Sequence, residues 1–298
     1  MERNIKRRSL YGRPVDKIKK TVGNFIFYAS LVFISVIMLY PLLFMILAGF
    51  FTADEYNNAV LTLFPIAKNP TFSNYLALFT LGEVAVPFLN SLFRTIYTSA
   101  MIAISTVACG YVFSRLRFKG RNIILMGLIL TSMVPATVTM IPTFLLYVRW
   151  NLYDTWFVYL VGGVSINTMG TFIVKQYLDS IPVSLDESAK IDGAGTARII
   201  FGILLPLAKP IMGYIIITTA IGVWNDWSTA FFYTESSSLE LLPSAITRLS
   251  MKANEGSALP DYPRMITLGL ALTIPALVIY LCFQRYIVEG IAHAGIKG

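Results

Sequence analysis

The sequence is poor in charged residues, histidine and cysteine. Charged residues make up 13% of its 298 positions, about half of the share in an ordinary soluble domain. The single histidine, His293, falls among the last six residues, so the apolar runs contain neither a HExxH metal site nor a Ser-His pair. Cys109 and Cys282 both lie inside apolar runs, which argues against a disulfide framework. No GxxxxGK[ST] phosphate loop occurs, and the chain therefore lacks this kind of ATP site.

Long apolar runs take the place of these groups. Hydrophobic residues make up 56% of the chain, and a membrane-crossing helix needs about 20 mostly apolar residues. Prolines interrupt several of the runs, which membrane helices tolerate as kinks. The pattern predicts an all-α membrane protein with six transmembrane helices, near residues 24–50, 88–113, 122–148, 156–178, 206–224 and 264–284.

The basic residues indicate the orientation of these helices. If the N-terminal segment is cytoplasmic, eighteen of the 24 lysines and arginines fall on the cytoplasmic side, five on the other, and Arg94 within the second run. This bias predicts that both termini are cytoplasmic. The net charge of +8 is then a topology signal, and no nucleic-acid partner is expected. Arg94 is expected near the outer end of its helix, with its side chain reaching the interface.

We expect one transmembrane domain over residues 1–298, since no repeat or soluble domain is visible. Residues 1–23 form a cytoplasmic N-terminal segment and residues 286–298 a cytoplasmic tail. The outer segments 51–87 and 225–263 contain turn signals and are predicted to be small ordered caps. Trp224 and Trp227 are typical of an interfacial aromatic belt.

A polar stretch over residues 184–206 interrupts the apolar pattern on the cytoplasmic side. Ser184 and Glu187 have the spacing of a capping box, which predicts a helix starting at Leu185. Asp186 and Lys190 have the spacing of a surface ion pair on that helix. Gly193 is expected to end it by adopting left-handed backbone geometry.

The following residues predict a second helix, capped by Thr196 and running into the fifth apolar run. Two turns of helix are too short to be stable alone, so the first helix must pack against its own membrane helices or another protein. Its small residues would allow close approach by a partner. From the residues alone, a capped connector helix at the membrane surface is the favoured interpretation, because a capping box is a common device.

The same stretch resembles the signature loop of the membrane subunits of bacterial ATP-binding-cassette importers. That loop reads Glu-Ala-Ala, three residues, Gly, nine residues, Ile, one residue, Leu-Pro, and every spacing is met here, with Ser188 in place of the second motif residue. The resemblance implies that the loop is a coupling helix docking on an ATPase. It assigns this role to Glu187, Ser188, Ala189, Asp192, Gly193, Ala194, Leu205 and Pro206.

Other segments are similar to the sugar-importing branch of this family, especially its maltose-type second permease subunit. They include "NPTFSNY", "NSLFRT", "GYVFSRLRFKGR", "WNDW" and the tail "QRYIVEGIAHAGIKG". The resemblance implies a MetI-like type I permease fold in the cytoplasmic (inner) membrane. It also implies a second, different permease subunit, a cytoplasmic ATPase dimer and an extracytoplasmic solute-binding protein. The chain itself would be no enzyme and hold no cofactor or metal, because ATP and Mg²⁺ would bind the ATPase subunits.

A sugar path needs hydrogen-bonding side chains. The candidates are Asn167 and Thr168 in the fourth apolar run, with Asn225 and Asp226 after the fifth. A secondary transporter is the main alternative, although it would be expected to show inverted repeats or ionisable groups near the midplane. A permease for a non-sugar solute is a further alternative. An intramembrane enzyme is another possibility, but it would need a nucleophile and a base, and the apolar runs contain no such pair.

Overall fold

The computed structural model describes residues 14–58, 63–80, 82–255 and 261–295, and within these ranges it is helical with no strand. The long elements are α1 (Pro14–Ala48), α4 (Gly82–Arg115), α12 (Lys209–Trp224) and α15 (Tyr262–Gly295). Two further pairs are α5 (Arg121–Thr131) with α6 (Ala136–Arg149), and α7 (Phe157–Gly163) with α8 (Thr168–Asp179). The chain thus follows the six apolar runs in order.

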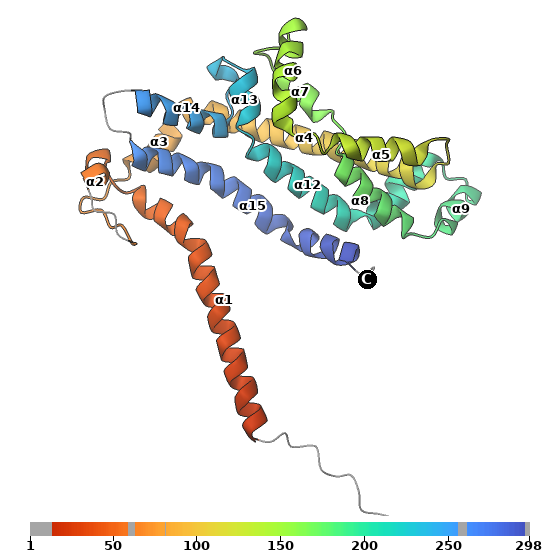
Figure 1. Ribbon diagram of the computed structural model, residues 1–298, viewed down its shortest axis with the longest axis horizontal. Coiled ribbons are helices and arrows are strands. Elements are labelled where there is room, and N and C mark those ends of the chain that lie inside the picture. The colour runs from red at the N-terminus through yellow and green to blue at the C-terminus, as the bar shows by residue number, and fades with distance from the viewer. Residues whose placement is uncertain (1–13, 59–62, 81, 256–260, 296–298) are drawn as a thin grey trace, which may run out of the picture.

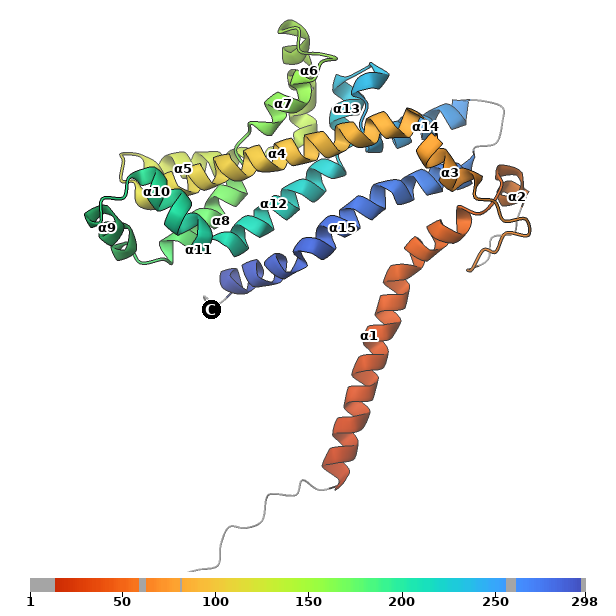
Figure 2. The ribbon, with the colours of Figure 1, turned by 180° about the vertical axis from the view of Figure 1, so that it is seen from behind.

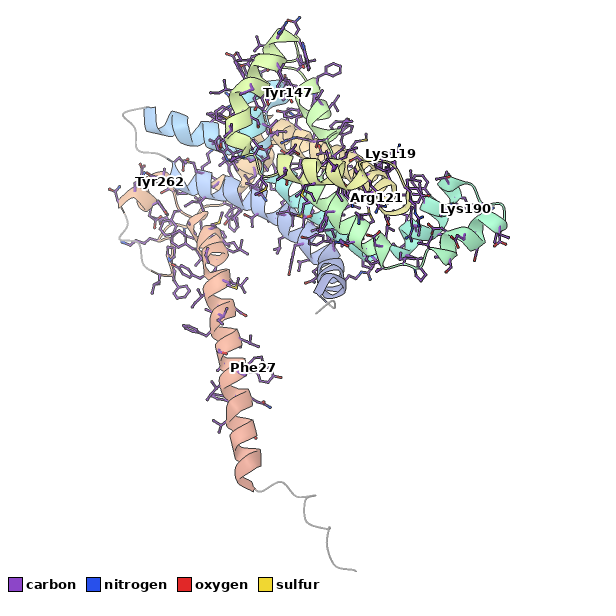
Figure 3. The ribbon with its side chains drawn as sticks, turned by 45° about the vertical axis from the view of Figure 1, so that its right-hand side comes forward. Phe27, Lys119, Arg121, Tyr147, Lys190 and Tyr262 are labelled. Carbon is purple, nitrogen blue, oxygen red and sulfur yellow. The ribbon has the colours of Figure 1, made fainter. Side chains whose placement is uncertain are left out.

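Helices α4, α8, α12 and α15 form the body of the molecule. Contacts join α12 to α15 and α4 to both α8 and α12, and these helices run side by side in Figure 1 and Figure 2. Helix α1 contacts α15 but then extends away from the body, so its apolar side chains, such as Phe27 in Figure 3, are exposed. Of the two predicted terminal segments, residues 1–13 and 296–298 lie outside the described residues, while α1 and α15 contribute the rest as helix.

The prediction of six spans is confirmed in number, but two of them are broken. Four described segments are long and apolar enough to cross a membrane, and two bent helix pairs bring the total to six. The α5–α6 pair is bent by 92° just before Pro135, and the pair joining residues 196–207 to α12 by 82° at Ala208. Both breaks lie next to prolines, which remove a helical hydrogen bond and clash with the preceding turn.

The two outer segments fold into short helices. They are α2 (Ala53–Asn58), α3 (Ser73–Thr80), α13 (Ser228–Tyr233), the 3₁₀ turn η2 (Ser237–Leu239) and α14 (Leu242–Glu255). Amide side chains fasten them to the body. Asn74 Nδ2 donates to the carbonyls of Gly49 and Phe51 at 3.0 and 2.8 Å, and Asn90 Nδ2 on α4 donates to those of Ser238 and Glu240, both at 2.9 Å.

Trp224 is part of the core rather than an interfacial belt. It is 1% exposed, packs edge-on against Phe88, and donates from Nε1 to the Leu272 carbonyl at 2.8 Å. The sequence prediction for Trp224 was wrong because a tryptophan at the end of an apolar run looks the same in both settings. Trp227, by contrast, is 42% exposed.

Gly110 on α4 packs tightly against Val174 on α8. A Cβ atom there would lie 2.4 Å from Cγ1 of Val174, which is 1% exposed. We therefore expect Gly110→Ala to destabilise the chain by about 1–3 kcal/mol, the usual cost of overpacking a core. Thermal unfolding of the detergent-solubilised protein measures this. Gly127→Ala on α5, where an added Cβ meets nothing within 4 Å, is the control, and equal melting temperatures for the two variants would refute the prediction.

Candidate functional site

The signature loop forms a separate short helix, α9 (Ser184–Ile191), which projects from one end of the body (Figure 1). Lys190 on α9 and Lys119 and Arg121 on the neighbouring turn lie toward this same end in Figure 3, away from Tyr262. These three basic residues, which the sequence predicts on the cytoplasmic side, thus lie at the same end of the body as α9.

The N-terminus of α9 is not closed by the predicted capping box. The N-cap residue is Val183, no side chain caps the helix, and the amides of Asp186 and Glu187 instead bond the Val183 carbonyl at 3.0 and 3.2 Å. Val183 is already in helical geometry, with φ −64° and ψ −27°, so Ser184 lies inside the helix. A capping serine needs extended backbone geometry, and Ser184 therefore cannot serve as the cap.

The C-terminus of α9 is as predicted. Gly193 has φ +80°, its amide donates to the Lys190 carbonyl at 3.0 Å, and the amide of Ala194 donates to the Ala189 carbonyl at 2.9 Å. These two bonds make a Schellman motif, which requires a left-handed residue at the glycine position. The glycine of the signature thus fixes where α9 ends.

The two faces of α9 have different surroundings. Ala189 is buried in the main hydrophobic cluster with Tyr111, Leu178 and Leu204, and Ala194 packs against that cluster. Glu187, Ser188, Asp192 and Gly193 are exposed, and Ile191 is 86% exposed. The predicted docking set is therefore split, because Ala189 and Ala194 attach α9 to its own chain, whereas Glu187, Ser188, Asp192 and Gly193 face outward.

Asp186 does not form the predicted surface pair with Lys190. It is 4% exposed, and its Oδ2 lies 2.9 Å from Nε of Arg115, the last residue of α4. The spacing rule failed because Asp186 faces the body, where a partner from a distant segment is available. Lys190 is exposed.

The chain returns to the membrane through a helix of changing pitch. It comprises α10 (Thr196–Ile199), a π-helical turn η1 (Ile200–Leu204) and α11 (Leu205–Leu207). Gly195 is the N-cap of α10 and no side chain caps it, so the predicted cap by Thr196 was wrong. Pro206 follows the π turn, and a proline cannot donate the hydrogen bond of a regular α-helix. Leu205 is half-buried against the main cluster, whereas Pro206 is exposed.

Asn167 and Thr168 begin α8. The Oδ1 atom of Asn167 accepts from the Gly170 amide at 2.7 Å and so caps the helix. Thr168 is the first helical residue, and both are half-buried. Gly170 lies against Thr106 in the middle of α4.

Asn225 and Asp226 lie at the other end of the body. Asn225 is exposed and donates from Nδ2 to the Ile221 carbonyl at 2.9 Å. Asp226 pairs with Arg94, 12 positions before Thr106 on α4, which corresponds to about 18 Å of helix. The structure therefore places the four path candidates in two separate groups.

Arg94 does not reach the interface as predicted. Its Nη2 lies 2.6 Å from Oδ2 of Asp226, its side chain is 9% exposed, and its guanidinium lies over the ring of Tyr159. Asp226 also accepts hydrogen bonds from Ser228 and Thr229. Burial works against ionisation, but the charge of Arg94 and these hydrogen bonds outweigh it and lower the pKa of Asp226 to about 2. Arg94 is buried because Asp226, in the loop after α12, supplies a charged partner.

Sequence reasoning missed two residues at the α9 end of the molecule. Arg115 counted only as one of several basic residues, and nothing in its local pattern points to a partner on α9. Ile191 could have been found, because a helix that buries Asp186 and Ala189 turns Glu187 and Ile191, four positions apart, to the opposite side.

Comparisons with known proteins identify the family of this chain. Residues 106–293 match the family model described as "binding-protein-dependent transport system inner membrane component". The galactooligosaccharides transport system permease protein of Bacillus subtilis (strain 168) is 31% identical over 95% of this chain and 98% of its own length. The maltodextrin transport system permease protein of Streptococcus pneumoniae is 27% identical, covering 95% and 98%.

A solved structure has the same fold. One chain of a bacterial transporter involved in the import of the acidic polysaccharide alginate superposes with a TM-score of 0.75 at 21% identity, covering 93% of this chain and 99% of that one. The matched family region runs from Thr106 on α4 into α15 and includes α9 and Arg115. This chain therefore belongs to the family of binding-protein-dependent transport system inner membrane components, as a multi-pass permease subunit of an ABC transporter.

Proposed function

We propose that this chain is one membrane-spanning subunit of an ATP-driven importer that carries an oligosaccharide into the cytoplasm. The observation that carries the proposal is α9, a short helix held rigidly by its inner face while Glu187, Ser188 and Ile191 face outward. Two turns of helix are not stable alone, and packing of the inner face on the body supplies the support that α9 needs. The outward face is therefore available for contact with another protein. Relatives named for galactooligosaccharides, arabinooligosaccharides and maltodextrin support an oligosaccharide as substrate.

The energy for transport then comes from a partner. We assign α9 to a cleft of a cytoplasmic ATPase dimer, which binds ATP and Mg²⁺, and place both termini on the same cytoplasmic side. A second, different permease subunit completes the membrane part, and an extracytoplasmic binding protein delivers the sugar. One of the solved relatives is the alginate transporter in complex with a pentasaccharide-bound periplasmic protein, which supports this last partner. Asn167, Thr168, Asn225 and Asp226 remain candidates for the sugar path.

Reconstitution in sealed vesicles tests the proposal. The chain is purified with the proteins that accompany it, and uptake of galacto-, arabino- and malto-oligosaccharides is measured with ATP on the side of α9. We expect uptake of at least one of these sugars to require ATP and the ATPase, and to survive collapse of the ion gradients. Uptake that persists without ATP and stops when the gradients collapse would identify a secondary transporter instead.

The variant Gly193→Pro tests the role of α9 in that assay. Proline holds φ near −65° and has no amide hydrogen, whereas Gly193 has φ +80° and donates to Lys190. The end of α9 must rearrange, and we expect ATP-driven uptake to be lost while membrane insertion is unchanged. Gly195→Ala is the control, since Gly195 has φ −73° and an added Cβ meets nothing within 4 Å. Wild-type uptake by Gly193→Pro would mean that α9 has no coupling role.

A further inference from the structure

Arg115 holds α9 against the end of α4. Its Nε lies 2.9 Å from Oδ2 of Asp186, and its Nη2 donates at 3.1 Å to the carbonyl of Ile181, in the loop that leads into α9. Both charged side chains are 5% exposed. Arg115, the last residue of α4, thus contacts both α9 and the loop that precedes it.

This ion pair is poorly suited to a purely stabilising role. The second carboxylate oxygen of Asp186, Oδ1, is buried and has no hydrogen-bond partner among the described residues. A buried pair offsets the cost of desolvation only when its remaining polar atoms are also satisfied. A buried ion pair on its own adds little net stability, and what this pair does fix is the position of α9 against α4.

The chain segments that connect α9 to α8 and to α12 are less direct than its ion pair with α4. Toward α8 the chain passes through residues 180–183, which lie outside both helices. Toward α12 it passes through the π turn η1 and the 82° bend at Ala208. Breaks of this kind absorb displacement as hinges do.

Helix α4 offers a continuous route instead. It is one helix from Gly82 to Arg115, and Figure 2 shows it running along the body, with α9 near one end and α14 near the other. Arg94 and Arg115 are 21 residues apart on it, which corresponds to about 32 Å, and no proline lies between them. The ion pair of Arg115 joins the last residue of α4 to α9, and that of Arg94, 12 residues after the start of α4, joins it to Asp226 after α12.

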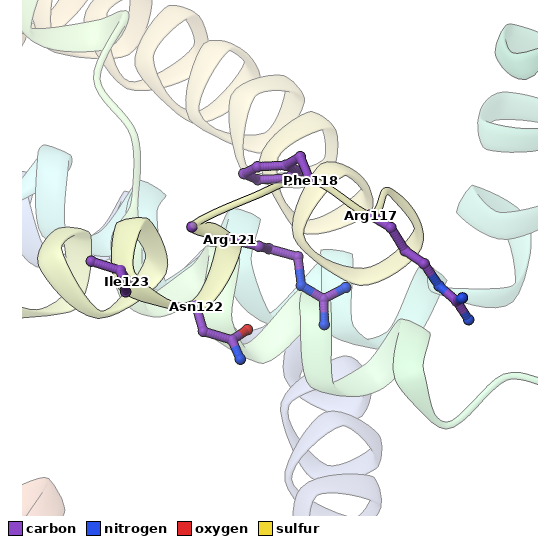
Figure 4. A pocket seen from close by; sticks show the side chains of 6 residues that line it. Arg117, Phe118, Arg121, Asn122 and Ile123 are labelled. Atoms are coloured by element: carbon purple, nitrogen blue, oxygen red, sulfur yellow. The ribbon is translucent and has the colours of Figure 1, made fainter.

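Neighbouring contacts hold the Arg115 end of α4 in place. Ser114 Oγ donates to Asp179 Oδ1 on α8 at 2.7 Å. Arg121 donates from Nη1 to the Ser114 and Leu116 carbonyls at 3.5 and 3.4 Å. In Figure 4 the guanidinium of Arg121 turns back toward the end of α4, whereas Arg117 extends outward. Arg121 thus donates to carbonyls at the end of α4, while Arg115 pairs with Asp186.

We propose that Arg115 and Asp186 are positioning residues for transport, because their ion pair makes α4 move with α9 when the ATPase displaces α9. The inference rests on the proposed function. It makes α4, rather than the chain leading into α12, the helix that first receives the motion. It also predicts that the outer Arg94–Asp226 contact responds to events at α9.

The test uses the complete reconstituted complex and the double variant Arg115→Met/Asp186→Asn, which removes both charges and leaves neither buried alone. Three quantities are measured: the amount of ATPase that co-purifies, ATP hydrolysis, and sugar imported per ATP, using the oligosaccharide of the panel that the wild-type complex imports. We expect normal assembly and continued hydrolysis, with sugar per ATP reduced at least about fivefold, the lower end of typical coupling energies. Lys175→Met is the matched control, because it removes a nearby ion pair, Lys175–Asp179, that does not involve α9.

A wild-type ratio in the double variant would overturn the inference. If the variant does not assemble, spin-label distances in the complex carrying native Arg115 and Asp186 decide, with Cys109 and Cys282 replaced by serine. The distance from Lys190→Cys on α9 to Ala108→Cys on α4 should be unchanged on ATP binding, while that to Thr218→Cys on α12 should change. Equal changes in both distances would also overturn it. Failure of the wild-type complex to import with ATP would instead refute the proposed function.

Discussion

Replacing Ile191 by glutamate is expected to prevent the ATPase from binding while leaving the chain itself folded. Ile191 is 86% exposed at the end of α9, and burying an isoleucine side chain contributes about 1.5–3 kcal/mol. The substitution removes this contribution and adds the cost of desolvating a carboxylate. Together these effects predict at least about a 100-fold loss of affinity, since 1.4 kcal/mol corresponds to tenfold.

Co-purification and titration of the ATPase against the reconstituted permease pair measure this effect. Lys190→Ala is the control, because Lys190 is exposed on the same turn and its truncation removes no apolar anchor. The melting temperature of the isolated chain should not change, since Ile191 belongs to none of the buried clusters. Undiminished ATPase affinity of the glutamate variant would show that the partner binds elsewhere.

Replacing Asp226 by alanine is expected to cause the largest loss of stability. The change leaves Arg94, whose side chain is 9% exposed, without its ion-pair partner, and removing one member of a buried pair costs about 3–5 kcal/mol. It also removes the acceptor for Ser228 and Thr229 at the start of α13. Asn225→Ala is the control, because Asn225 is exposed and, within the part of the chain that the structure describes, its side chain bonds only to the Ile221 carbonyl.

Thermal unfolding as a function of pH separates this effect from a general weakening. The pKa of Asp226 is lowered from 3.8 to about 2, so its contribution is complete above about pH 4 and is lost as the pH falls toward 2. The difference in melting temperature between wild type and Asp226→Ala should therefore be constant from pH 8 to 5. Adding Arg94→Met to Asp226→Ala should restore part of the lost melting temperature. A difference that disappeared by pH 5 would contradict the assignment.

Local and compositional features of the fold could be predicted from the sequence. The apolar runs predicted the six spans in order, and Gly193 predicted the end of α9. Both features depend on residues that are close together in the chain. The breaks at Pro135 and Ala208 were expected only as kinks. A proline shows where a helix weakens, but the packing of neighbouring helices decides how far it bends.

Contacts between distant segments could not be predicted. The expected surface partner of Asp186 was Lys190, four positions away, whereas the structure pairs it with Arg115 on α4. Arg94 was expected at the interface for the same reason, although its partner lies 132 positions along the chain. Spacing rules describe only neighbours on one helix, so they cannot identify which charged groups tertiary folding brings together.

The division of α9 into two faces also has a consequence for evolution. Glu187, Ser188 and Ile191 are exposed, so these positions can vary with little penalty to folding. Asp186 and Ala189 are constrained by α4 and the main cluster. A lineage can therefore adapt its outward face to a different ATPase by single substitutions, each of which leaves a folded permease available to selection.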